Sequence, residues 1–433
     1  MKKVLIITYY WPPSGGAGVQ RWLKFVKYLR DFGWEPIIFT PENPELPETD
    51  LSLLNDVPEK LTILKTPIWE PYNFYKKFTG KAKETRISAG FLKEEKKSKF
   101  SDSISVWIRG NFFIPDARKF WIKPSVKFLS DYLKINKTDA IVSTGPPHSC
   151  HLIALGIKQK LNIPWLADFR DPWTGIDFYQ DLKLTTYADK QHKQFENQVL
   201  KNADSVVVIS PTMADEFQLL LNKNYTVITN GYDDSDYSNN QRIQPDKSFS
   251  ISHIGSLVPS RNPRLLWEVL AEMINNGHPL KDFLEIKLVG KVDYSVFEET
   301  EKLGLKSFIT KIEYLPHTDV VTLQKQSQIL LLLINDTPNS KSILTGKFFE
   351  YLAAQRPILC IGPEDGDAAK ILEECAAGTC VDYLNKEKLK NVIDQYFHEY
   401  KNGILQINSA KTAQYSRKNL TMQLSQELNR IIN

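Results

Sequence analysis

The stretch SKSILTGKFFEYLAAQRP, residues Ser340–Pro357, leads from a turn rich in Ser, Thr and Gly into a helix that ends before Pro357. In this helix Lys347 and Glu350 are three residues apart and therefore lie near one face. The backbone N–H groups of a helix start attract phosphate, a lysine adds a mobile positive charge, and a carboxylate accepts hydrogen bonds from a vicinal diol. The pattern is typical of a nucleotide-sugar site, although many ordinary helices carry an isolated Lys-x-x-Glu pair at their surface.

The size and composition of the chain limit what it can be. Its 433 residues exceed what one hydrophobic core usually fills, so we expect two domains. The formal net charge is only +4 and no nucleic-acid-binding motif is present, so a nucleic-acid partner is not expected. The cysteines form no CxxC motif and lack a matching histidine pair, which favours reduced core thiols. They are Cys150, Cys360, Cys375 and Cys380.

The N-terminal sequence MKKVLIITYYWPP contains an apolar run that is too short for a signal peptide. We interpret it as a first buried strand and expect a cytoplasmic protein. The most apolar stretch, Ile329–Ile334, is also far too short to span a bilayer.

The chain opens with a pattern of strand, glycine loop and helix. A β-branched run at Val4–Thr8 is followed by the loop WPPSGGAG and by helical spacing over Val19–Asp31. Gly15 and Gly16 would let the backbone approach a ligand at the carboxyl end of the first strand, where open α/β sheets place their sites. The spacing is not G-x-G-x-x-G, so a plain tight turn is an equal alternative.

Further apolar strands alternate with segments of helical length, which predicts parallel, doubly wound sheets. In the first half they are Pro36–Thr40, Leu61–Lys65, Ala140–Thr144, Trp165–Asp168, Ser205–Ile209 and Thr226–Thr229. In the second half they are Ser250–Ile254, Glu285–Val289, Phe308–Tyr314, Ile329–Ile334, Ile358–Ile361 and Thr379–Asp382. The polar segment after Asn230 breaks this series and marks a domain boundary. We predict a first domain over residues 1–230, with 412–433 packing back on it, and a second over 231–411.

The segment 75–124 interrupts the alternation. Its first half is lysine-rich, and its second half interleaves aromatic with basic residues, a composition that suits a peripheral membrane surface. The alternative is a solvated loop followed by a helix whose aromatic residues enter the core.

Two strand ends in the first half carry polar side chains that should face one crevice. The sequence STGPPHSCH, which contains His148 and His151, follows one strand, and DFRDPWTG follows the next with Asp168, Arg170 and Asp171. A carboxylate there could orient or deprotonate an acceptor hydroxyl, and an arginine could bind an anion. A structural ion-pair cluster is the alternative. With no third ligand beside the two histidines, a metal site is not expected.

The second domain repeats the strand, loop and helix start. Its first turn, GSLVPSR, runs from Gly255 to Arg261, just before a helix. A guanidinium at this place can grip a diphosphate in bidentate fashion, while the helix start adds partial positive charge. An ordinary exposed arginine is the alternative.

The order of these parts resembles the retaining glycosyltransferases of family 4, which have two facing Rossmann-like domains, the GT-B fold. Four motifs carry the resemblance over nearly the whole chain: PPSGGAGVQR, ITNGYD, GSLVPSR and TGKFFEYLAAQRPIL. It implies that Arg261 and Lys347 hold the donor diphosphate, that Glu350 binds the donor ribose, and that the backbone of Leu315–His317 meets the nucleobase. The implied donor-binding set is Gly15, Gly16, Gly255, Arg261, His317, Thr345, Gly346, Lys347 and Glu350.

The chain departs from the family pattern at three places. Many relatives carry an arginine where this chain has Ser256, and a sugar-contacting glutamate where it has Ser342. Lys347 can offset the lost cation, but the donor sugar is left open. The usual acceptor-side histidine has no counterpart in DFRDPW, where Asp171 is our candidate. We assign His148, Asp168, Arg170 and Asp171 to the acceptor side, and Asp171, Arg261 and Lys347 to catalysis.

The resemblance implies a hexosyltransferase that moves a sugar from a nucleoside-diphosphate sugar to a saccharide or lipid-linked acceptor with retention, without a metal or other cofactor. Cell-surface polysaccharide or glycoconjugate synthesis at the inner face of the membrane is the expected setting. Two alternatives remain: a nucleotide-sugar 2-epimerase of the same architecture, and a non-catalytic scaffold that keeps the nucleotide site.

Overall fold

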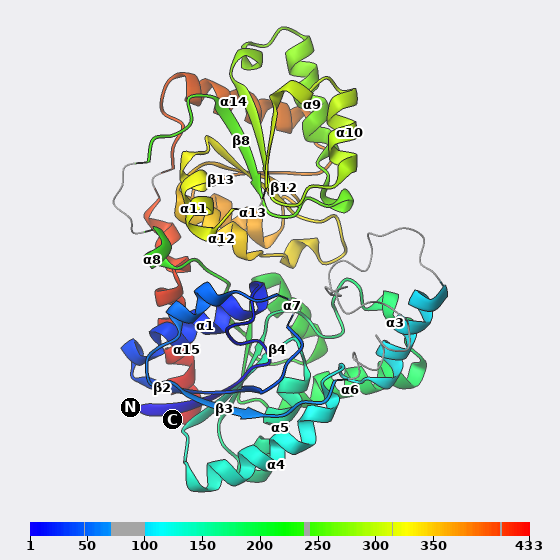
Figure 1. The fold of residues 1–433 in the computed structure, drawn as a ribbon, viewed down its shortest axis with the longest axis vertical. Coiled ribbons are helices and arrows are strands. Elements are labelled where there is room, and N and C mark those ends of the chain that lie inside the picture. The colour runs from blue at the N-terminus through cyan, green and yellow to red at the C-terminus, as the bar shows by residue number, and fades with distance from the viewer. Residues whose placement is uncertain (47, 71–99, 238–242, 314, 408) are drawn as a thin grey trace. The chain divides into compact units, whose positions relative to one another are not determined.

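The structure is a computed structural model that describes all residues except 47, 71–99, 238–242, 314 and 408 (Figure 1). The lysine-rich first half of the 75–124 segment therefore lies outside the described residues. The chain divides into two compact units. Unit 1 comprises Met1–Thr229 and Arg417–Asn433, and unit 2 comprises Asn230–Ser416.

Unit 1 is built on a parallel sheet of seven strands among the described residues, in the order β3-β2-β1-β4-β5-β6-β7. The strands are β1 (Lys2–Ile7), β2 (Trp34–Pro41), β3 (Thr62–Thr66), β4 (Ala140–Gly145), β5 (Trp165–Phe169), β6 (Ser205–Val208) and β7 (Thr226–Val227). The helices are α1 (Ala17–Leu29), α3 (Phe100–Phe112), α4 (Lys119–Ile135), α5 (Ser149–Leu161), α6 (Thr186–Asn202), α7 (Pro211–Leu220) and α15 (Arg417–Ile432).

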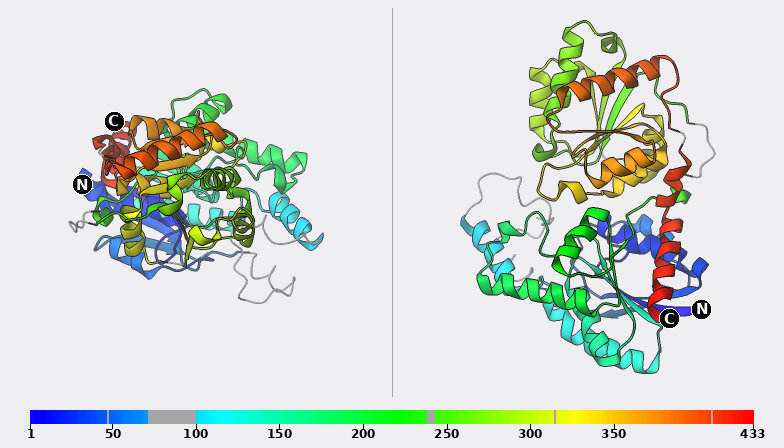
Figure 2. Two further views of the ribbon diagram at one scale, coloured as in Figure 1. Left: turned by 90° about the horizontal axis from the view of Figure 1, so that it is seen from above. Right: turned by 180° about the vertical axis from the view of Figure 1, so that it is seen from behind.

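Side chains of β1 enter two hydrophobic clusters, one on each face of the sheet. Val4 and Ile6 pack with residues of α1 and α15, whereas Leu5 and Ile7 pack with residues of α4 and α5. Successive strand residues point to opposite faces, so a continuous apolar strand requires helices on both sides. Figure 2 shows α15, in red, lying along this sheet, and α1 is its main helix neighbour.

Unit 2 contains a second parallel sheet, of six strands among the described residues, in the order β10-β9-β8-β11-β12-β13. The strands are β8 (Phe249–Ile254), β9 (Leu284–Val289), β10 (Ile309–Ile312), β11 (Ile329–Leu333), β12 (Ile358–Ile361) and β13 (Gly378–Val381). The helices are α8 (Asp234–Tyr237), α9 (Arg264–Asn275), α10 (Tyr294–Lys302), α11 (His317–Gln326), α12 (Gly346–Ala354), α13 (Asp367–Glu374) and α14 (Lys386–Lys401). The expected class, two doubly wound Rossmann-like α/β units, is confirmed.

The C-terminal segment is divided between the two units. Ala410–Tyr415 forms a short 3-10 helix that belongs to unit 2, where Tyr415 contacts Phe349 with ring centroids 5.4 Å apart. The α-helix of unit 1 begins only at Arg417.

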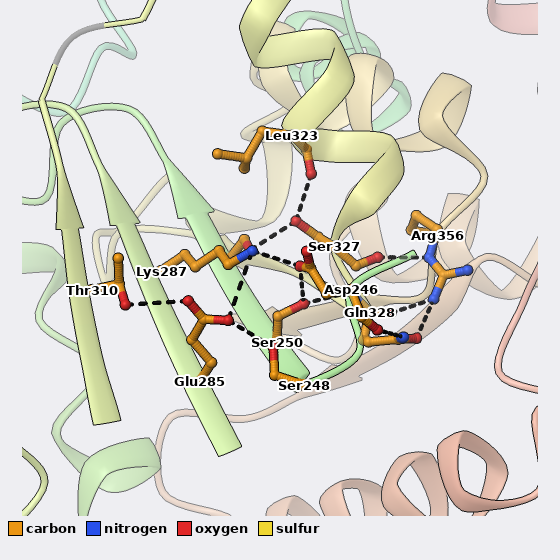
Figure 3. Close-up of polar contacts among 11 residues, drawn as sticks. Asp246, Ser248, Ser250, Glu285, Lys287, Thr310, Leu323, Ser327, Gln328 and Arg356 are labelled. Atoms are coloured by element: carbon orange, nitrogen blue, oxygen red, sulfur yellow. Dashed lines mark hydrogen bonds and ion pairs between the residues drawn. The ribbon is translucent and has the colours of Figure 1, made fainter. Parts of the chain in front are cut away.

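A polar network at the amino ends of β8, β9 and β11 anchors the carboxyl end of α12 (Figure 3). Arg356 donates from Nε to the carbonyl of Ser327 at 2.6 Å and from Nη2 to Oε1 of Gln328 at 2.6 Å. Close by, the Lys287 ammonium lies 2.6 Å from the Asp246 carboxylate. Because α12 runs back across the sheet, holding this end fixes where its first turn emerges at the carboxyl edge.

Among the described residues, no helix combines the length and the apolar character that crossing a bilayer requires.

Candidate functional site

The start of α12 offers hydrogen-bond donors that no side chain occupies. Thr345 is the N-cap, with an extended backbone at φ −75° and ψ 155°, and no side-chain hydrogen bond caps this end. In the described structure its buried hydroxyl Oγ1 has no hydrogen-bond partner. The first N–H groups of a helix lack intrahelical acceptors, so an uncapped start beside a free hydroxyl can receive an anion.

The Lys347 side chain stands directly against Gly255, at the carboxyl end of β8. A Cβ atom added to Gly255 would lie 2.8 Å from the Lys347 ammonium nitrogen, and Gly255 has φ +114°, a conformation that favours glycine. A side chain here would therefore displace the lysine. The GSLVPSR and TGKFFEYLAAQRPIL motifs, which are far apart in the sequence, meet at this point.

Arg261 brings a second cation to the same edge. It ends a 3-10 turn, Pro259–Arg261, and its Nε donates to the side-chain oxygen of Asn335, the second residue after β11. Burial and, to a smaller extent, the positive charge of Arg261 lower the pKa of Lys347 to about 8, with Glu350 opposing both effects. Two neighbouring cations in a partly buried place are an arrangement that a bound anion would stabilise.

Glu350 is not simply the ion-pair partner of Lys347, because the two side chains make no direct ion pair in the described structure. Its Oε2 lies 3.4 Å from the side-chain nitrogen of Gln324, which is fully buried. Gln324 in turn accepts a hydrogen bond of 2.7 Å from the Tyr237 hydroxyl. The buried amide of Gln324 thus orients the Glu350 carboxylate, which can still accept further hydrogen bonds.

His317 begins α11, and its Nε2 lies 3.2 Å from the Asp236 carboxylate of α8. Tyr314, immediately before the predicted nucleobase contact at 315–317, lies outside the described residues. That contact stays a prediction.

Of the positions that depart from the family pattern, Ser342 is buried and donates 2.9 Å to the carbonyl of Asn339, so it adds no charge to the site. His253, a buried β8 residue that sequence reasoning did not single out, is held neutral because burial and the nearby Lys347 lower its pKa to about 3. Neither residue therefore adds positive charge beside Arg261 and Lys347.

In unit 1 the glycine loop packs against the segment around Glu48. The Gly15 amide donates to the carbonyl of Glu48 at 3.0 Å, and a Cβ atom on Gly15 would lie 2.8 Å from Cγ of Glu48. Gly16 has φ +88°, and a Cβ there would lie 3.1 Å from the Glu48 carboxylate. Close packing against Glu48 favours glycine at Gly15, and the positive φ favours it at Gly16, so their role towards a donor stays a prediction.

Asp168 is buried in unit 1, where it forms an ion pair. Its side chain is 1% exposed and accepts 2.8 Å from Arg21, 2.7 Å from the Trp22 indole and 2.9 Å from the Thr144 hydroxyl. Burial tends to raise the pKa of Asp168, but Arg21 and these hydrogen bonds outweigh it and hold the pKa below 3.8. The structure thus gives Asp168 an ion pair with Arg21, not with Arg170 as the structural alternative supposed.

Arg170 and Asp171 follow β5 and have different surroundings. Arg170 donates to the carbonyl of Gly18 at 2.8 Å and to that of Pro146, so it ties the glycine loop to the loop after β4. Burial raises the pKa of Asp171 to about 6, with Arg170 opposing and Asp177 reinforcing the shift. Within the described part of the chain, no hydrogen bond reaches the Asp171 carboxylate. It is therefore available to a ligand, with a pKa close to neutrality.

His148 belongs to a stack of rings near the same edge. It lies parallel to Trp173 with centroids 4.4 Å apart, and the Trp173 indole donates 3.1 Å to His192. His151 stacks on Phe169 at 4.4 Å. Burial lowers the pKa values of His148, His151 and His192, and His148 also feels the adjacent His151. The described residues contain no group of three or more His, Cys, Asp or Glu side chains placed to hold a metal.

We compared the chain with known proteins. No family model and no curated protein matches the sequence. A glycosyltransferase from Rickettsia africae ESF-5 superposes with a TM-score of 0.60 at 15% identity, over 100% of this chain and 99% of that one. HepE from Anabaena, solved with UDP-glucose, gives 0.59 at 12% identity over 99% and 100%. A Listeria monocytogenes protein named as a UDP-N-acetylglucosamine 2-epimerase gives 0.54 at 12% identity over 98% and 95%.

The chain has the GT-B fold. At these identities the likeness shows the fold alone, so the chemistry has to come from the residues. In doubly wound sheets ligands bind outside the carboxyl ends of the strands. The candidate residues of both GT-B units meet this condition: Arg261 and Lys347 lie at the carboxyl edge of unit 2, and His148 and Asp171 at that of unit 1.

Sequence reasoning missed the residues that hold the candidate side chains in place. Asn335 holds Arg261, Gln324 holds Glu350, and Trp173 covers His148. Asn335 could have been found as a polar residue just after an apolar strand. Gln324 lies inside a helix with no local pattern that marks it.

Proposed function

We propose that this protein is a glycosyltransferase that moves a sugar from a nucleoside-diphosphate sugar to an acceptor hydroxyl. The observation that carries the proposal is the meeting of Lys347, Arg261 and the uncapped start of α12 at the end of β8. Two cations and a row of free N–H groups match the charge and the acceptors of a diphosphate. HepE, which shares the fold, was solved with UDP-glucose, and this supports the same class of donor.

In this proposal unit 2 binds the donor. Arg261 and Lys347 contact the diphosphate together with Thr345 and the Gly346 amide, and Gly255 leaves room for the lysine. Glu350, oriented by Gln324, accepts hydrogen bonds from the ribose hydroxyls. The nucleobase would lie against the backbone of 315–317.

The chemical step breaks the bond between the anomeric carbon and the phosphate oxygen and forms one to the acceptor oxygen. The electron pair leaves with the diphosphate, and the acceptor proton passes to the departing phosphate or to Asp171. Negative charge grows on the leaving group, so Arg261 and Lys347 stabilise the transition state more than the bound donor. We propose retention of configuration because the resemblance to family 4 implies it. We also propose that no metal is needed, because the two cations supply the charge that the leaving group requires.

Arg261→Ala and Glu350→Ala test the donor site. We expect Arg261→Ala to lower kcat/KM by about 100- to 1,000-fold, the usual effect of removing one donor that stabilises the charge of a transition state. Glu350→Ala should raise KM for the donor, because it removes hydrogen bonds made equally to bound donor and transition state. The assay is donor turnover with UDP-glucose as the first probe, followed by GDP-, ADP- and dTDP-sugars.

The matched control is Arg264→Ala. This arginine is three residues away and exposed, and it contacts Glu299 at 3.5 Å. Its turnover should equal that of the parent. Parent-level activity in both site variants would refute the donor-site assignment.

Asp171→Asn tests the acceptor side. The pKa of about 6 makes Asp171 ionised at pH 7 and able to accept or attract a proton, so the variant should lose at least tenfold in kcat/KM. The kcat/KM of the parent should decrease as the pH falls below about 6, because Asp171 becomes protonated. This decrease should be absent in the variant. A folded state with a raised carboxyl pKa loses stability as pH rises from 3.8 towards 6, so Asp171→Asn should also unfold at a higher temperature at pH 7. If kcat/KM of Asp171→Asn decreased at low pH as that of the parent does, Asp171 would not be the group that accepts the proton.

The 2-epimerase is the second candidate, since the Listeria protein of that name shares the fold. Incubation of a UDP-sugar without an acceptor distinguishes the two: an epimerised sugar favours the isomerase, and unchanged donor that turns over only with an acceptor favours the transferase. A non-catalytic scaffold, which the uncharged Ser342 allows, would bind the nucleotide and show neither reaction.

We further propose that the acceptor is a saccharide or a lipid-linked saccharide in cell-surface polysaccharide or glycoconjugate synthesis. The corresponding place is the cytoplasmic face of a membrane, and liposome-bound acceptors are the first to test.

A further inference from the structure

Unit 1 exposes aromatic side chains around α3 and the start of α4. We call this the aromatic surface: the exposed Trp69, Trp107, Ile108, Phe112 and Phe120, with the half-buried Phe113 beside them. Phe112 is 59% and Trp69 58% exposed. The rings touch in sequence-distant pairs, because Trp69 lies after β3 and contacts Phe120 edge to face at 4.8 Å. Trp107 and Phe112 are likewise in contact, with centroids 5.8 Å apart.

These rings are distinct from the aromatic core of the unit. Trp121, the neighbour of Phe120, is fully buried and stacks on Phe39 with centroids 5.0 Å apart and planes 5° from parallel. One turn of helix therefore sends one ring into the core and the next outward. A group of exposed large apolar side chains on a folded unit marks an interaction surface rather than unfinished packing.

Cations accompany the exposed rings. The Lys119 ammonium lies 5.3 Å from the centre of Phe120 and 5.8 Å from that of Phe113, and it donates to the carbonyl of Phe112 at 2.6 Å. Arg109 and Lys123 also belong to this surface, and in the described part of the chain neither has an acidic partner.

Two carboxylates close to the start of α4 are engaged by other groups of unit 1. Asp116 accepts hydrogen bonds from the amide and the hydroxyl of Ser149, at 2.9 and 2.7 Å. Glu70 is 6% exposed and pairs with Arg118 at 3.0 Å. Neither of these two carboxylates therefore pairs with Arg109, Lys119 or Lys123.

We propose that the aromatic surface docks on an anionic lipid bilayer, with the rings at the level of the headgroups and Arg109, Lys119 and Lys123 on the lipid phosphates. Trp and Phe beside Lys and Arg are the composition that binds this interface, since the rings gain burial and the cations gain anionic partners. The inference is independent of the proposed transfer reaction. It assigns membrane contact to α3, α4 and the segment after β3. That segment includes Trp69, which precedes the 75–124 segment identified from the sequence.

Vesicle co-sedimentation of the full chain tests the proposal. We expect the parent to bind vesicles of phosphatidylcholine and phosphatidylglycerol at 3:1 at least tenfold more tightly than phosphatidylcholine alone. Trp107→Ser/Phe112→Ser/Phe120→Ser and Arg109→Glu/Lys123→Glu should each weaken binding to anionic vesicles by tenfold or more, while the circular dichroism spectrum stays that of the parent.

Matched controls in the same unit are Leu219→Ser/Leu220→Ser, exposed apolar residues of α7, and Lys137→Glu/Lys160→Glu, exposed lysines elsewhere. Both should bind as the parent does. Equal loss in the controls, or no loss in either surface variant, would overturn the proposal. So would sedimentation without lipid showing a parent dimer that the aromatic variant converts to monomer, since the surface would then join two copies of the chain.

Discussion

Replacing Asp168 by alanine is expected to lower the free energy of unfolding of unit 1 by about 3–5 kcal/mol, the usual cost of removing one partner of a buried ion pair. The Arg21 side chain is only 1% exposed. Its remaining acceptors would be the carbonyls of Ile228 and Thr229, at 2.8 and 2.7 Å, which carry only partial charge. The Trp22 indole and the Thr144 hydroxyl would also lose their acceptor.

Urea unfolding followed by tryptophan fluorescence measures this effect, because eight of the nine tryptophans belong to unit 1. The control is Asp131→Ala, whose exposed ion pair with Lys134 at 3.3 Å should be worth less than about 0.5 kcal/mol. A loss below about 1 kcal/mol for Asp168→Ala would contradict the buried-pair account.

The same ion pair predicts a pH dependence. The folded-state pKa of Asp168 lies below 3.8, so its contribution is complete above that pH. The contribution is lost as pH falls through the folded-state pKa. The difference in stability between parent and Asp168→Ala should therefore shrink in acid.

Replacing Lys347 by methionine is expected to weaken nucleoside-diphosphate binding by about 10- to 150-fold, which corresponds to about 1.5–3 kcal/mol for one hydrogen bond to a charged group. The pKa of about 8 adds a sharper expectation. Affinity of the parent should decline as pH rises from 7.5 to 9.5, because the deprotonated lysine no longer attracts phosphate. Lys347→Arg, which stays charged, should bind with little change over this range. Titration calorimetry with UDP, GDP, ADP and dTDP measures all three proteins.

The lysine also carries a stability cost that its removal should reveal. In the unfolded chain its pKa is 10.5, so between about pH 8 and 10.5 the unfolded state binds a proton that the folded state has released. Stability from this group therefore rises with pH over that range, and at pH 7 the buried charge is unfavourable. Lys347→Met should unfold at a higher temperature than the parent at pH 7. A variant that binds UDP like the parent at pH 7.5 would remove Lys347 from the donor site.

Much of the fold could be predicted because it is encoded locally. Strands buried on both faces appear as continuous apolar runs, such as the one over Val4–Thr8, and the helices between them show helical spacing. The donor-side candidates could be named for the same reason, since Arg261 and Lys347 each stand in a short motif where a turn leads into a helix.

The acceptor side could not be resolved in this way. Asp168, Arg170 and Asp171 are neighbours in sequence, yet one is locked to Arg21, one ties two loops together, and one stays free to accept a proton. Nothing local distinguishes them, because the partner of Asp168 lies 147 positions away. Phe120 and Trp121 are a second case, where adjacent rings go to solvent and to core.

By itself the sequence determined the alternation of strands and helices, the two sheets and the positions of the strand-end motifs, because apolar periodicity and turn chemistry act between near neighbours. Only the tertiary structure decided which groups surround each charged side chain. Lys347 packs against Gly255, Arg21 pairs with Asp168, and cations lie among the exposed rings of α3 and α4. Such pairings depend on burial and on distances across the sheet, where a low local dielectric makes each unpaired charge costly, and no spacing along the chain records them.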